Sequence, residues 1–185
     1  MAMIHCGTQT IETERLLLRR FTLDDAEDMF RNVCSDSRVN RFLTWELHTS
    51  LDETRELMKS FVSRYENDAR YCWAIEEEST GRVIGTIAAP TVKELTRTVE
   101  VTYALAFDRW GKGMTAEALR AVIGFLFDRV GVNRVEAGHD SRNPNSGRVM
   151  EKAGMRREGV LRQAGMNNTG LFDLVMYSVL KSDRA

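Results

Sequence analysis

The sequence has little proline and no surplus of charge of either sign. Only 2 of the 185 residues are proline, against 13 glycines, so no segment has the composition of a flexible linker or a low-complexity region. Lysine and arginine number 26, and aspartate and glutamate number 27, which gives a net charge of -1. Because a general nucleic-acid-binding protein carries a basic surplus, the composition argues against nucleic acid as a partner.

Long apolar runs are also missing. The longest, residues 121–127, is bounded by Arg120 and Asp128, and it is far shorter than the roughly 20 residues that cross a bilayer. Residues 1–13 lack the basic and then apolar order of a secretory signal. We therefore expect no membrane partner and a location in the cytoplasm.

Cysteine and histidine are few, and their positions exclude two kinds of site. The cysteines are Cys6, Cys34 and Cys72, and the histidines are His5, His48 and His139. The cysteines are odd in number and include no Cys-x-x-Cys pair, so neither a disulfide framework nor a zinc knuckle is expected, which fits a reducing compartment. The histidines have no metal-ligand spacing, so we expect no metal cofactor.

What remains is the composition of an ordinary globular domain. Hydrophobic residues make up 43% of the chain and charged residues 29%, and both values are near the globular average. At roughly 100–200 residues per domain, the length corresponds to one domain over residues 1–185. We expect residues 1–13 to form a flexible tail.

Hydrophobic periodicity predicts a sheet flanked by helices. Short apolar or alternating runs, typical of strands, lie at residues 15–21, 71–76, 83–89, 99–107, 132–137, 155–161 and 171–180. Apolar residues at helical spacing, with capping residues nearby, lie at residues 22–33, 50–65, 119–130 and 144–153. The sequence therefore predicts an α/β (α+β) fold, with a mixed sheet of about seven strands and about four helices.

The segment that carries chemistry, residues 108–118, lies between a predicted strand and a predicted helix. Gly111 and Gly113 have no Cβ, so the backbone there can approach a ligand closely. The N–H groups of the first helical turn and the helix dipole favour an anion, and Lys112 could add a positive charge. The pattern outlines a cradle for a diphosphate, although an ordinary strand-to-helix turn also uses glycines in this way.

Two common phosphate-binding patterns fit this segment poorly. The P-loop needs four residues between its first glycine and Gly-Lys, and that spacing is absent. The dinucleotide fingerprint is half matched by Gly111, Gly113 and Ala116, with Glu136 at a tolerable distance. That fold requires repeated strand–helix–strand crossovers, whereas the last two predicted strands have no helix between them, so we reject it.

Seven short segments together resemble the GNAT acyltransferase superfamily. Residues 99–105 and 110–118 resemble motif A of the superfamily. Residues 143–146, 151–155 and 158–159 resemble its second motif, and residues 14–19 and 41–45 resemble the Rim-type group within it. The Rim-type (RimJ/RimL-like) proteins are ribosomal-protein N-terminal acetyltransferases. The likeness covers about residues 12–180, nearly the whole chain.

The resemblance implies a GNAT fold in which the fourth and fifth strands splay apart and hold acetyl-CoA, a co-substrate, between them. Backbone groups of three residues would bind the pantetheine arm: Leu105, Ala106 and Phe107. The following turn would hold the pyrophosphate: Arg109, Trp110, Gly111, Lys112, Gly113, Met114 and Thr115. The far side of the coenzyme would be lined by Asn143, Ser146 and Lys152. Thr102 and Thr115 depart from the small residues usual in the family.

Acetyl transfer to an amine needs a neutral amine, a stabilised oxyanion and a departing thiolate. A backbone N–H near residues 105–107 could stabilise the oxyanion. Several relatives use a tyrosine acid where this chain has Met150, so either Ser146 donates a proton or the thiolate, whose thiol pKa is about 8.5, leaves unaided. Glu100, where the Rim-type group also carries glutamate, is the candidate base through a water; the alternatives are a solvent-facing strand residue or a salt-bridge partner.

Three further residues are candidates for the acceptor site. His48 is a second candidate base, with a histidine on a surface loop as the alternative. Phe42 and Trp45 could form a wall of the acceptor site or belong to the core. The resemblance also implies a possible homodimer.

The pKa of the acceptor amine favours an N-terminal α-amine. Deprotonating an α-amine at pH 7 costs about 1–1.4 kcal/mol, against about 4.6 kcal/mol for a lysine. A site without an obvious strong base suits the α-amine of a protein or peptide better. Two alternatives remain open: a small amine such as a polyamine, amino acid or aminoglycoside, attracted by Glu46, Asp52 and Glu53, or a sensor that binds acyl-CoA without turnover.

Overall fold

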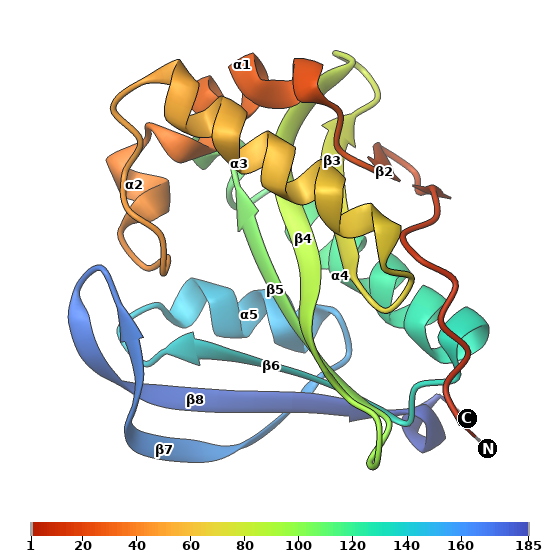
Figure 1. The fold of residues 1–185 in the computed structure, drawn as a ribbon. Coiled ribbons are helices and arrows are strands. Elements are labelled where there is room, and N and C mark those ends of the chain that lie inside the picture. Colours follow the sequence, from red (N-terminus) through yellow and green to blue (C-terminus); the bar gives the residue numbers. More distant parts are fainter. Residues whose placement is uncertain (1, 185) are drawn as a thin grey trace.

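The computed structural model describes residues 2–184 and contains one eight-stranded sheet in the order β1-β2-β3-β4-β5-β6-β8-β7 (Figure 1). The strands are β1 (Ile11–Glu12), β2 (Leu16–Arg19), β3 (Tyr71–Glu77), β4 (Arg82–Lys93), β5 (Thr98–Leu105), β6 (Arg134–Asp140), β7 (Arg156–Asn167) and β8 (Gly170–Leu180). The helices are α1 (Ala26–Met29), α2 (Ser37–Asn40), α3 (Leu51–Ser63), α4 (Met114–Phe125) and α5 (Pro144–Lys152).

The predicted mixed α/β architecture is confirmed, with one more strand and one more helix than expected. The extra strand, β1, is a two-residue pairing of Ile11 with Leu18 and of Glu12 with Leu17, too short to give an alternating pattern. The extra helix, α2, has only four residues, and Asp36 caps it by accepting a hydrogen bond from the Arg38 N–H. Both elements are shorter than the window over which periodicity is visible.

The sheet splits between β5 and β6, the only parallel neighbours among the described strands. Their pairing runs from Thr98 opposite Arg134 to Glu100 opposite Glu136, and then stops. Residues 101–105 of β5 and 137–140 of β6 continue without pairing to each other. The predicted splay between the fourth and fifth of the expected strands is therefore confirmed.

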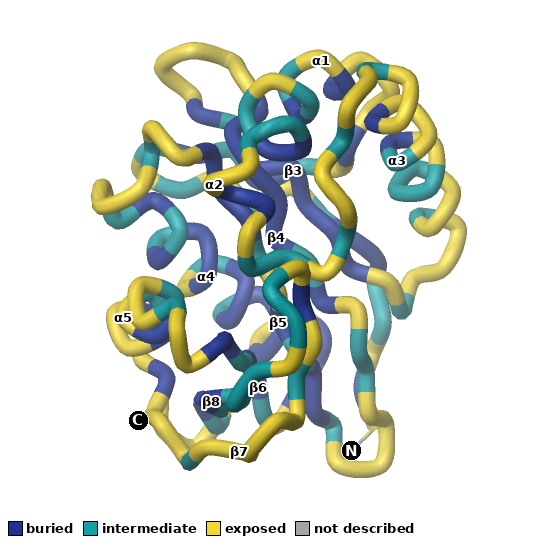
Figure 2. The backbone as a smooth tube through the Cα atoms, turned by 90° about the vertical axis from the view of Figure 1, so that its left-hand side faces the viewer, coloured by how far each residue is buried: buried dark blue, intermediate teal, exposed yellow. Residues whose placement is uncertain are grey.

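Two helical layers cover opposite faces of the sheet. On β5, Val99, Val101 and Leu105 pack into the core under α4 and α5, whereas Ala104 packs into the core under α1 and α3. This alternation is the two-residue period of a strand. Figures 1 and 2 show that α1 and α3 lie over β3 and β4, whereas none of the described helices covers the same face of β6, β8 and β7.

The N-terminal segment, where we expect a flexible tail, runs along the body of the protein. The Ile4 N–H donates to the Val130 carbonyl at 2.9 Å, and the Gly7 N–H donates to the Asp68 carbonyl at 3.0 Å. The Trp73 indole donates to the Gln9 carbonyl at 2.7 Å. The segment ends beside β2 and so reaches the N-terminus of α4. None of the helices within residues 2–184 has the length and apolar character needed to cross a membrane.

Candidate active site

The open gap between β5 and β6 exposes backbone groups of alternate β5 residues. The Ala106 N–H donates to the Ile84 carbonyl of β4 at 2.8 Å. Because hydrogen-bonding directions alternate along a strand, the backbone groups of Tyr103 and Leu105 face the gap instead. The Leu105 carbonyl already accepts from the Trp110 indole at 2.7 Å. The Leu105 N–H is therefore a donor directed into the gap.

Of the three residues expected to bind a pantetheine arm, Leu105 turns backbone groups toward the gap, whereas both backbone groups of Ala106 are already paired. The Ala106 N–H pairs with β4, and the Ala106 carbonyl accepts from the Arg109 N–H at 3.0 Å. The Phe107 carbonyl accepts from the Trp110 N–H at 3.1 Å, so it too is engaged within its own turn. The exposed rings of Phe107 and Trp110 lie 4.9 Å apart in the turn that follows β5.

The turn before α4 presents unpaired N–H groups. Gly111 and Gly113 have φ of 75° and 79°, a left-handed conformation that glycine adopts without strain. A Cβ at Gly111 would meet nothing within 4 Å, so glycine is needed there for conformation rather than space. The first helical bond runs from the Glu117 N–H to the Gly113 carbonyl at 3.0 Å, so the N–H groups of residues 113–116 remain available to an anion.

The N-terminal segment holds this turn through what we call the Arg15–Glu117 clasp. The Arg15 guanidinium donates to the Lys112 carbonyl at 3.0 Å and to the Glu117 carboxylate at 2.8 and 2.6 Å. Glu117 also accepts from Thr13 Oγ1 at 2.7 Å and from the Arg15 N–H at 3.0 Å. Burial alone would raise the pKa of Glu117, but these hydrogen bonds lower it. The negative charge nearest the anion site is thus compensated.

The side chain of Arg109 is engaged away from the expected pyrophosphate. Its guanidinium donates to Glu77 at 3.0 Å (Nε) and 2.8 Å (Nη2), and it also pairs with Asp108. The Arg109 partner lowers the pKa of Glu77. Arg109 therefore ties the turn to the end of β3, and Lys112 keeps its exposed position in the turn. Met114 is buried and Thr115 is half-buried in the first turn of α4.

A tyrosine that sequence reasoning missed spans the gap. The Tyr103 hydroxyl lies 2.9 Å from Ser146 Oγ and 3.0 Å from the Ser146 carbonyl on α5. Burial raises the pKa of Tyr103 well above its ordinary value, so the phenol keeps its proton. The pair brings two hydroxyls together between β5 and α5. The sequence does contain a signal for this contact, because Tyr103 shares an inward strand face with valine and leucine. A phenol hydroxyl buried on such a face needs a hydrogen-bond partner.

Two of the other α5 candidates lie at opposite ends of the helix. Asn143 is half-buried just before α5, and its side chain forms none of the hydrogen bonds found in the described residues. Lys152 is exposed at the far end, about 9 Å along the axis from Ser146 at 1.5 Å per residue. The structure therefore groups Asn143 with Ser146 but separates Lys152 from them. Met150 is buried in the core.

Glu100 lies where the gap begins. It is half-buried, it is the last β5 residue paired with β6, and its side chain has no hydrogen bond or ion pair within residues 2–184. Its neighbour Glu136 is bonded to Lys93 at 2.7 Å and to Arg134 at 3.0 Å. Burial would raise the pKa of Glu136, but these two cations lower it. The Glu100 carboxylate is thus free of side-chain partners, whereas the neighbouring Glu136 carboxylate is paired with two cations.

The three acceptor-site candidates lie on the loop between α2 and α3. Phe42 is half-buried under Arg41, whose guanidinium lies 5.1 Å from the ring centroid. Trp45 packs against the core beneath α1 and α3, and its indole nitrogen is buried without a partner in the described residues. His48 Nδ1 lies 2.7 Å from the hydroxyl of the buried Thr54, so one ring nitrogen is occupied.

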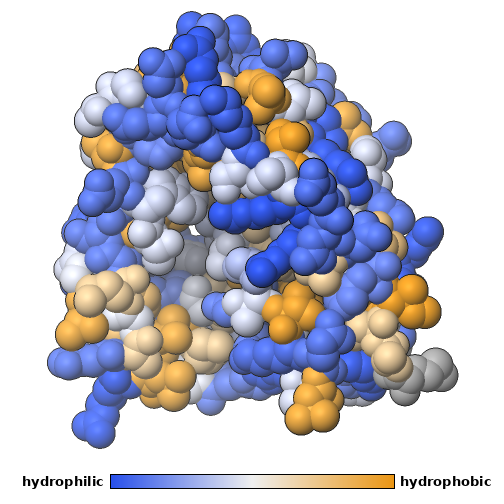
Figure 3. Space-filling model, in the orientation of Figure 1, coloured by the Kyte–Doolittle hydropathy of each residue, from blue (hydrophilic) through white to orange (hydrophobic). Residues whose placement is uncertain are grey.

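The turn between β7 and β8 contacts this loop at the end of the gap that lies away from the β5–β6 pairing. Asn168 donates its side-chain amide to the Trp45 carbonyl and to Asn40 Oδ1, both at 2.8 Å, and its N–H donates to the Leu43 carbonyl at 3.1 Å. Figure 1 shows this turn below α2, and Figure 3 shows the surface hollowed between α2 and β8. The β7–β8 turn and the loop after α2 therefore bridge the gap at this end.

Asp140, at the end of β6, anchors the same turn. Its buried carboxylate accepts from Asn167 Nδ2 at 2.9 Å and from the Arg142 side chain at 2.9 and 2.7 Å. Burial alone would raise the pKa of Asp140, but these hydrogen bonds hold it at about 2. No group of three or more histidine, cysteine or acidic side chains in the described part of the chain could hold a metal ion.

Comparisons with known proteins agree with this geometry. A family model described as "Acetyltransferase (GNAT) domain" matches residues 15–156. The chain is 31% identical over 171 residues to the uncharacterized N-acetyltransferase YoaA of Bacillus subtilis, covering 92% of this chain and 96% of that protein. It is 25% identical over 174 residues to the ribosomal-protein-serine acetyltransferase of Escherichia coli, covering 92% and 96%. A solved GNAT-family acetyltransferase from Bacillus anthracis superposes with a TM-score of 0.81 at 25% identity, covering 94% and 99%.

Proposed function

Because the chain belongs to the GNAT acetyltransferase family, we propose that it acetylates the N-terminal α-amine of a protein or peptide. It is an acetyl-CoA-dependent N-acetyltransferase, and the proposal concerns its acceptor. The observation that carries the proposal is the gap between β5 and β6, which has an anion-binding turn at its mouth and an uncommitted carboxylate at its base. The likeness to a ribosomal-protein-serine acetyltransferase supports a protein acceptor.

The residues around the gap fit acetyl-CoA. The left-handed glycines Gly111 and Gly113 bring free N–H groups to the surface, where a diphosphate would be held. The Leu105 N–H and the backbone of Tyr103 face the space that a pantetheine arm would fill. When bound, acetyl-CoA supplies the thioester carbonyl that the amine attacks.

We assign three roles to residues of this chain. Glu100 accepts the proton of the incoming ammonium through a water, because its carboxylate has no competing partner. The Leu105 N–H donates to the oxygen on which negative charge develops. The Tyr103–Ser146 hydroxyl pair donates a proton or a hydrogen bond to the departing sulfur, in the place of the tyrosine that Met150 replaces.

The α-amine fits this site better than a lysine side chain. A single carboxylate acting through water is a weak base, and deprotonating an α-amine at pH 7 costs about 1–1.4 kcal/mol against about 4.6 kcal/mol for lysine. The contact of Asn168 with the loop after α2 also narrows the entrance through which an acceptor reaches the gap. An extended N-terminus can enter such an opening more easily than a lysine on a folded surface.

The observations give less support to the two alternatives. Of the acids expected to attract a small cationic amine, Asp52 pairs with Arg55, and Glu53 accepts from Thr49 and Ser50. Glu46 alone remains exposed without such a contact in the described residues. A sensor without turnover would not need the hydroxyl pair that Tyr103 and Ser146 form.

The acceptor can be tested with matched peptides. One peptide has a free N-terminal serine and no lysine, and the other has a blocked N-terminus and one internal lysine. With acetyl-CoA, we expect thiol release with the first peptide to be at least 100-fold faster than with the second. Faster reaction of the blocked peptide, or of spermidine, would contradict the proposal. Coenzyme binding by calorimetry without turnover on any amine would favour the sensor.

We also propose that the protein works in the cytoplasm as a homodimer. Cys6, Cys34 and Cys72 are free thiols. Burial raises the pKa of Cys34 to about 11 and that of Cys72 to about 12, which suits inert core thiols. Strand β7 forms one end of the sheet and exposes apolar side chains, which supports pairing with a second copy.

A further inference from the structure

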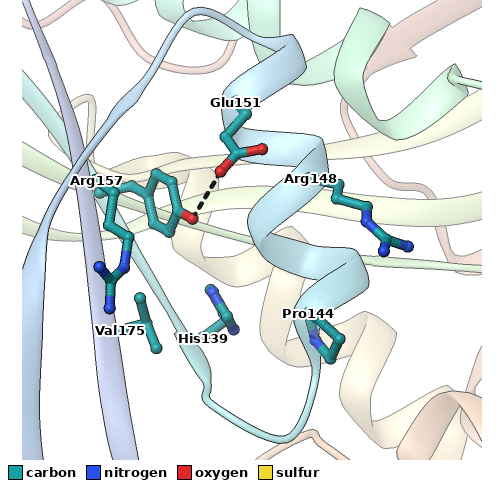
Figure 4. Close-up of a pocket in the computed structure, with 7 residues that line it drawn as sticks. His139, Pro144, Arg148, Glu151, Arg157 and Val175 are labelled. Atoms are coloured by element: carbon teal, nitrogen blue, oxygen red, sulfur yellow. Dashed lines mark hydrogen bonds between the residues drawn. The ribbon is translucent and has the colours of Figure 1, made fainter.

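A pocket of about 280 Å³ lies on the flank of α5 that faces away from the gap (Figure 4). It is lined by His139, Pro144, Arg148, Glu151, Arg157, Val175 and Tyr177. The α5 members are spaced four and three residues apart and so form one stripe. Ser146 lies about 160° around the helix from Arg148, at 100° per residue. The pocket is therefore separate from the candidate active site.

His139 directs an unused acceptor into this pocket. Its ring is nine-tenths buried, with an exposed fraction of 9%. Nδ1 lies 2.7 Å from the Asp140 carbonyl, and since a carbonyl can only accept, Nδ1 carries the proton. When the ring carries this proton alone, Nε2 is an acceptor, and it makes no hydrogen bond within residues 2–184. Because this nitrogen is accessible from the pocket, it can accept a hydrogen bond from a donor that enters there.

Gly147 of α5 packs closely against this nitrogen. A Cβ at Gly147 would lie 2.7 Å from His139 Nε2 and 3.1 Å from the Tyr177 hydroxyl oxygen. Two polar atoms from neighbouring strands therefore converge on an α5 position that has no side chain. The Tyr177 hydroxyl donates to Glu151 Oε1 at 3.1 Å, which leaves its lone pairs free to accept.

Three acceptors thus face one small region: the His139 Nε2, the Tyr177 oxygen and the Glu151 carboxylate. A primary ammonium has three N–H donors, which this set matches in number and charge. Glu151 has no ion pair within residues 2–184, so its charge is available to such a cation.

A positive group stands opposite this acceptor set. The side chain of Arg157 has no hydrogen bond or ion pair among the described residues, and Figure 4 shows it extending toward Val175 and His139. Arg148 instead donates to Asn145 at 3.0 Å, and its guanidinium points away from His139 in the same view. Val175 and Pro144 add apolar walls. The pocket offers acceptors, one cation and apolar surface together.

We propose that this pocket binds a zwitterionic α-amino acid with an apolar side chain. The ammonium lies against His139, Tyr177 and Glu151, and the carboxylate pairs with Arg157. The proposal does not depend on the acceptor of acetyl transfer, because the pocket and Ser146 lie on opposite flanks of α5.

The test uses imidazole NMR signals of the full chain without acetyl-CoA. The chain has only three histidines, so His5→Gln and His48→Gln assign the His139 signal by elimination. L-valine should shift that signal saturably. Valinamide, which lacks the carboxylate, and N-acetylvaline, which lacks the ammonium, should each bind at least tenfold more weakly. No saturable shift, or equal binding of all three compounds, would overturn the proposal.

Two variants and one control locate the site. Arg157→Gln and Glu151→Gln should each raise the Kd for L-valine at least tenfold. Arg162→Gln, which removes an exposed arginine elsewhere on β7, should leave it unchanged. Valine binding that survives Arg157→Gln and Glu151→Gln belongs to another site, such as the acceptor site, and also overturns the proposal. Far-UV circular dichroism of each variant checks that it folds.

Discussion

The reactivity that we assign to Glu100 rests on what surrounds it. Its neighbour Glu136 is hydrogen-bonded to Lys93 and Arg134, whereas the Glu100 carboxylate interacts with Lys93 through charge alone and has no hydrogen bond or ion pair within residues 2–184. A carboxylate without competing donors can orient a water toward an incoming ammonium. On the role that we propose for Glu100, two glutamates of one sheet would differ in function because they differ in hydrogen bonding.

Glu100→Gln should lower kcat at pH 7 by about 100-fold, because a general base contributes roughly 10²–10⁴-fold. The KM for acetyl-CoA should stay within twofold. Activity of the variant should recover as pH rises toward the pKa of the acceptor amine, because a neutral amine needs no base. Rates from pH 6 to 9 measure this, with the exposed Glu66→Gln as the control. An unaltered pH profile would remove Glu100 as the base.

Asp140 gives a second residue-scale prediction, on stability. Its pKa of about 2 in the folded protein lies below the ordinary value of 3.8. A lowered pKa means that the charged form stabilises the fold above pH 3.8, and that this contribution is lost as pH falls through about 2. Asp140→Asn should lower the free energy of unfolding at pH 7 by about 1–3 kcal/mol.

Urea unfolding at pH 7 and at pH 2.5 would measure the effect of Asp140→Asn. The difference from the parent protein should shrink at the lower pH, since Asp140 of the unfolded parent, with the ordinary pKa of 3.8, is then largely protonated. A difference that does not change with pH would mean that the charge of Asp140 contributes nothing.

At the scale of elements, the Arg15–Glu117 clasp connects the start of β2 with the start of α4. The Arg15 guanidinium holds a carbonyl of the glycine turn and the first-turn acid at once. The clasp fixes the direction in which the free N–H groups of residues 113–116 point. It also keeps the carboxylate of Glu117 paired, so that it repels a bound diphosphate less.

Arg15→Gln should therefore raise the KM for acetyl-CoA about tenfold, a loss of about 1.4 kcal/mol, with kcat changed less than twofold. Steady-state kinetics against the exposed Arg31→Gln control would separate this from a general loss of stability. A fall in kcat at unchanged KM would contradict a role in holding the turn.

Local sequence was sufficient for the elements but not for the contacts between them. The strands from 71 to 180 and the glycine turn follow from patterns of a few residues. The pairs that shape the site join distant segments: Tyr103 with Ser146, Arg15 with Glu117, and Asn168 with Asn40. Which strand meets which helix is set by topology, so neither periodicity nor spacing indicates these partners. The pairing of Arg109 with Glu77 could not be predicted for the same reason.

For the whole molecule, two of the connections between the halves of the sheet lie on either side of the gap. One is the three-residue ladder between β5 and β6, and the other is the contact of the β7–β8 turn with the loop after α2. Because the turn is the tip of the outermost hairpin, anything that binds β7 also acts on the entrance to the gap. A dimer through β7 would therefore be next to the acceptor site.

The edge strand β7 leads to the prediction on assembly. Leu161 and Met166 expose 53% and 64% of their surface, and Figure 3 shows apolar residues gathered over the β7–β8 hairpin. An unpaired edge with apolar side chains favours association.

Light scattering after size exclusion should give twice the chain mass of 21.1 kDa. The double variant Leu161→Lys, Met166→Lys should give a monomer, because two charges would be buried unpaired. Leu95→Lys, at a residue 99% exposed between β4 and β5, should leave the dimer intact. A parent protein that is monomeric at 50 µM, a concentration at which an association of roughly 1 µM Kd is nearly complete, would refute assembly through β7.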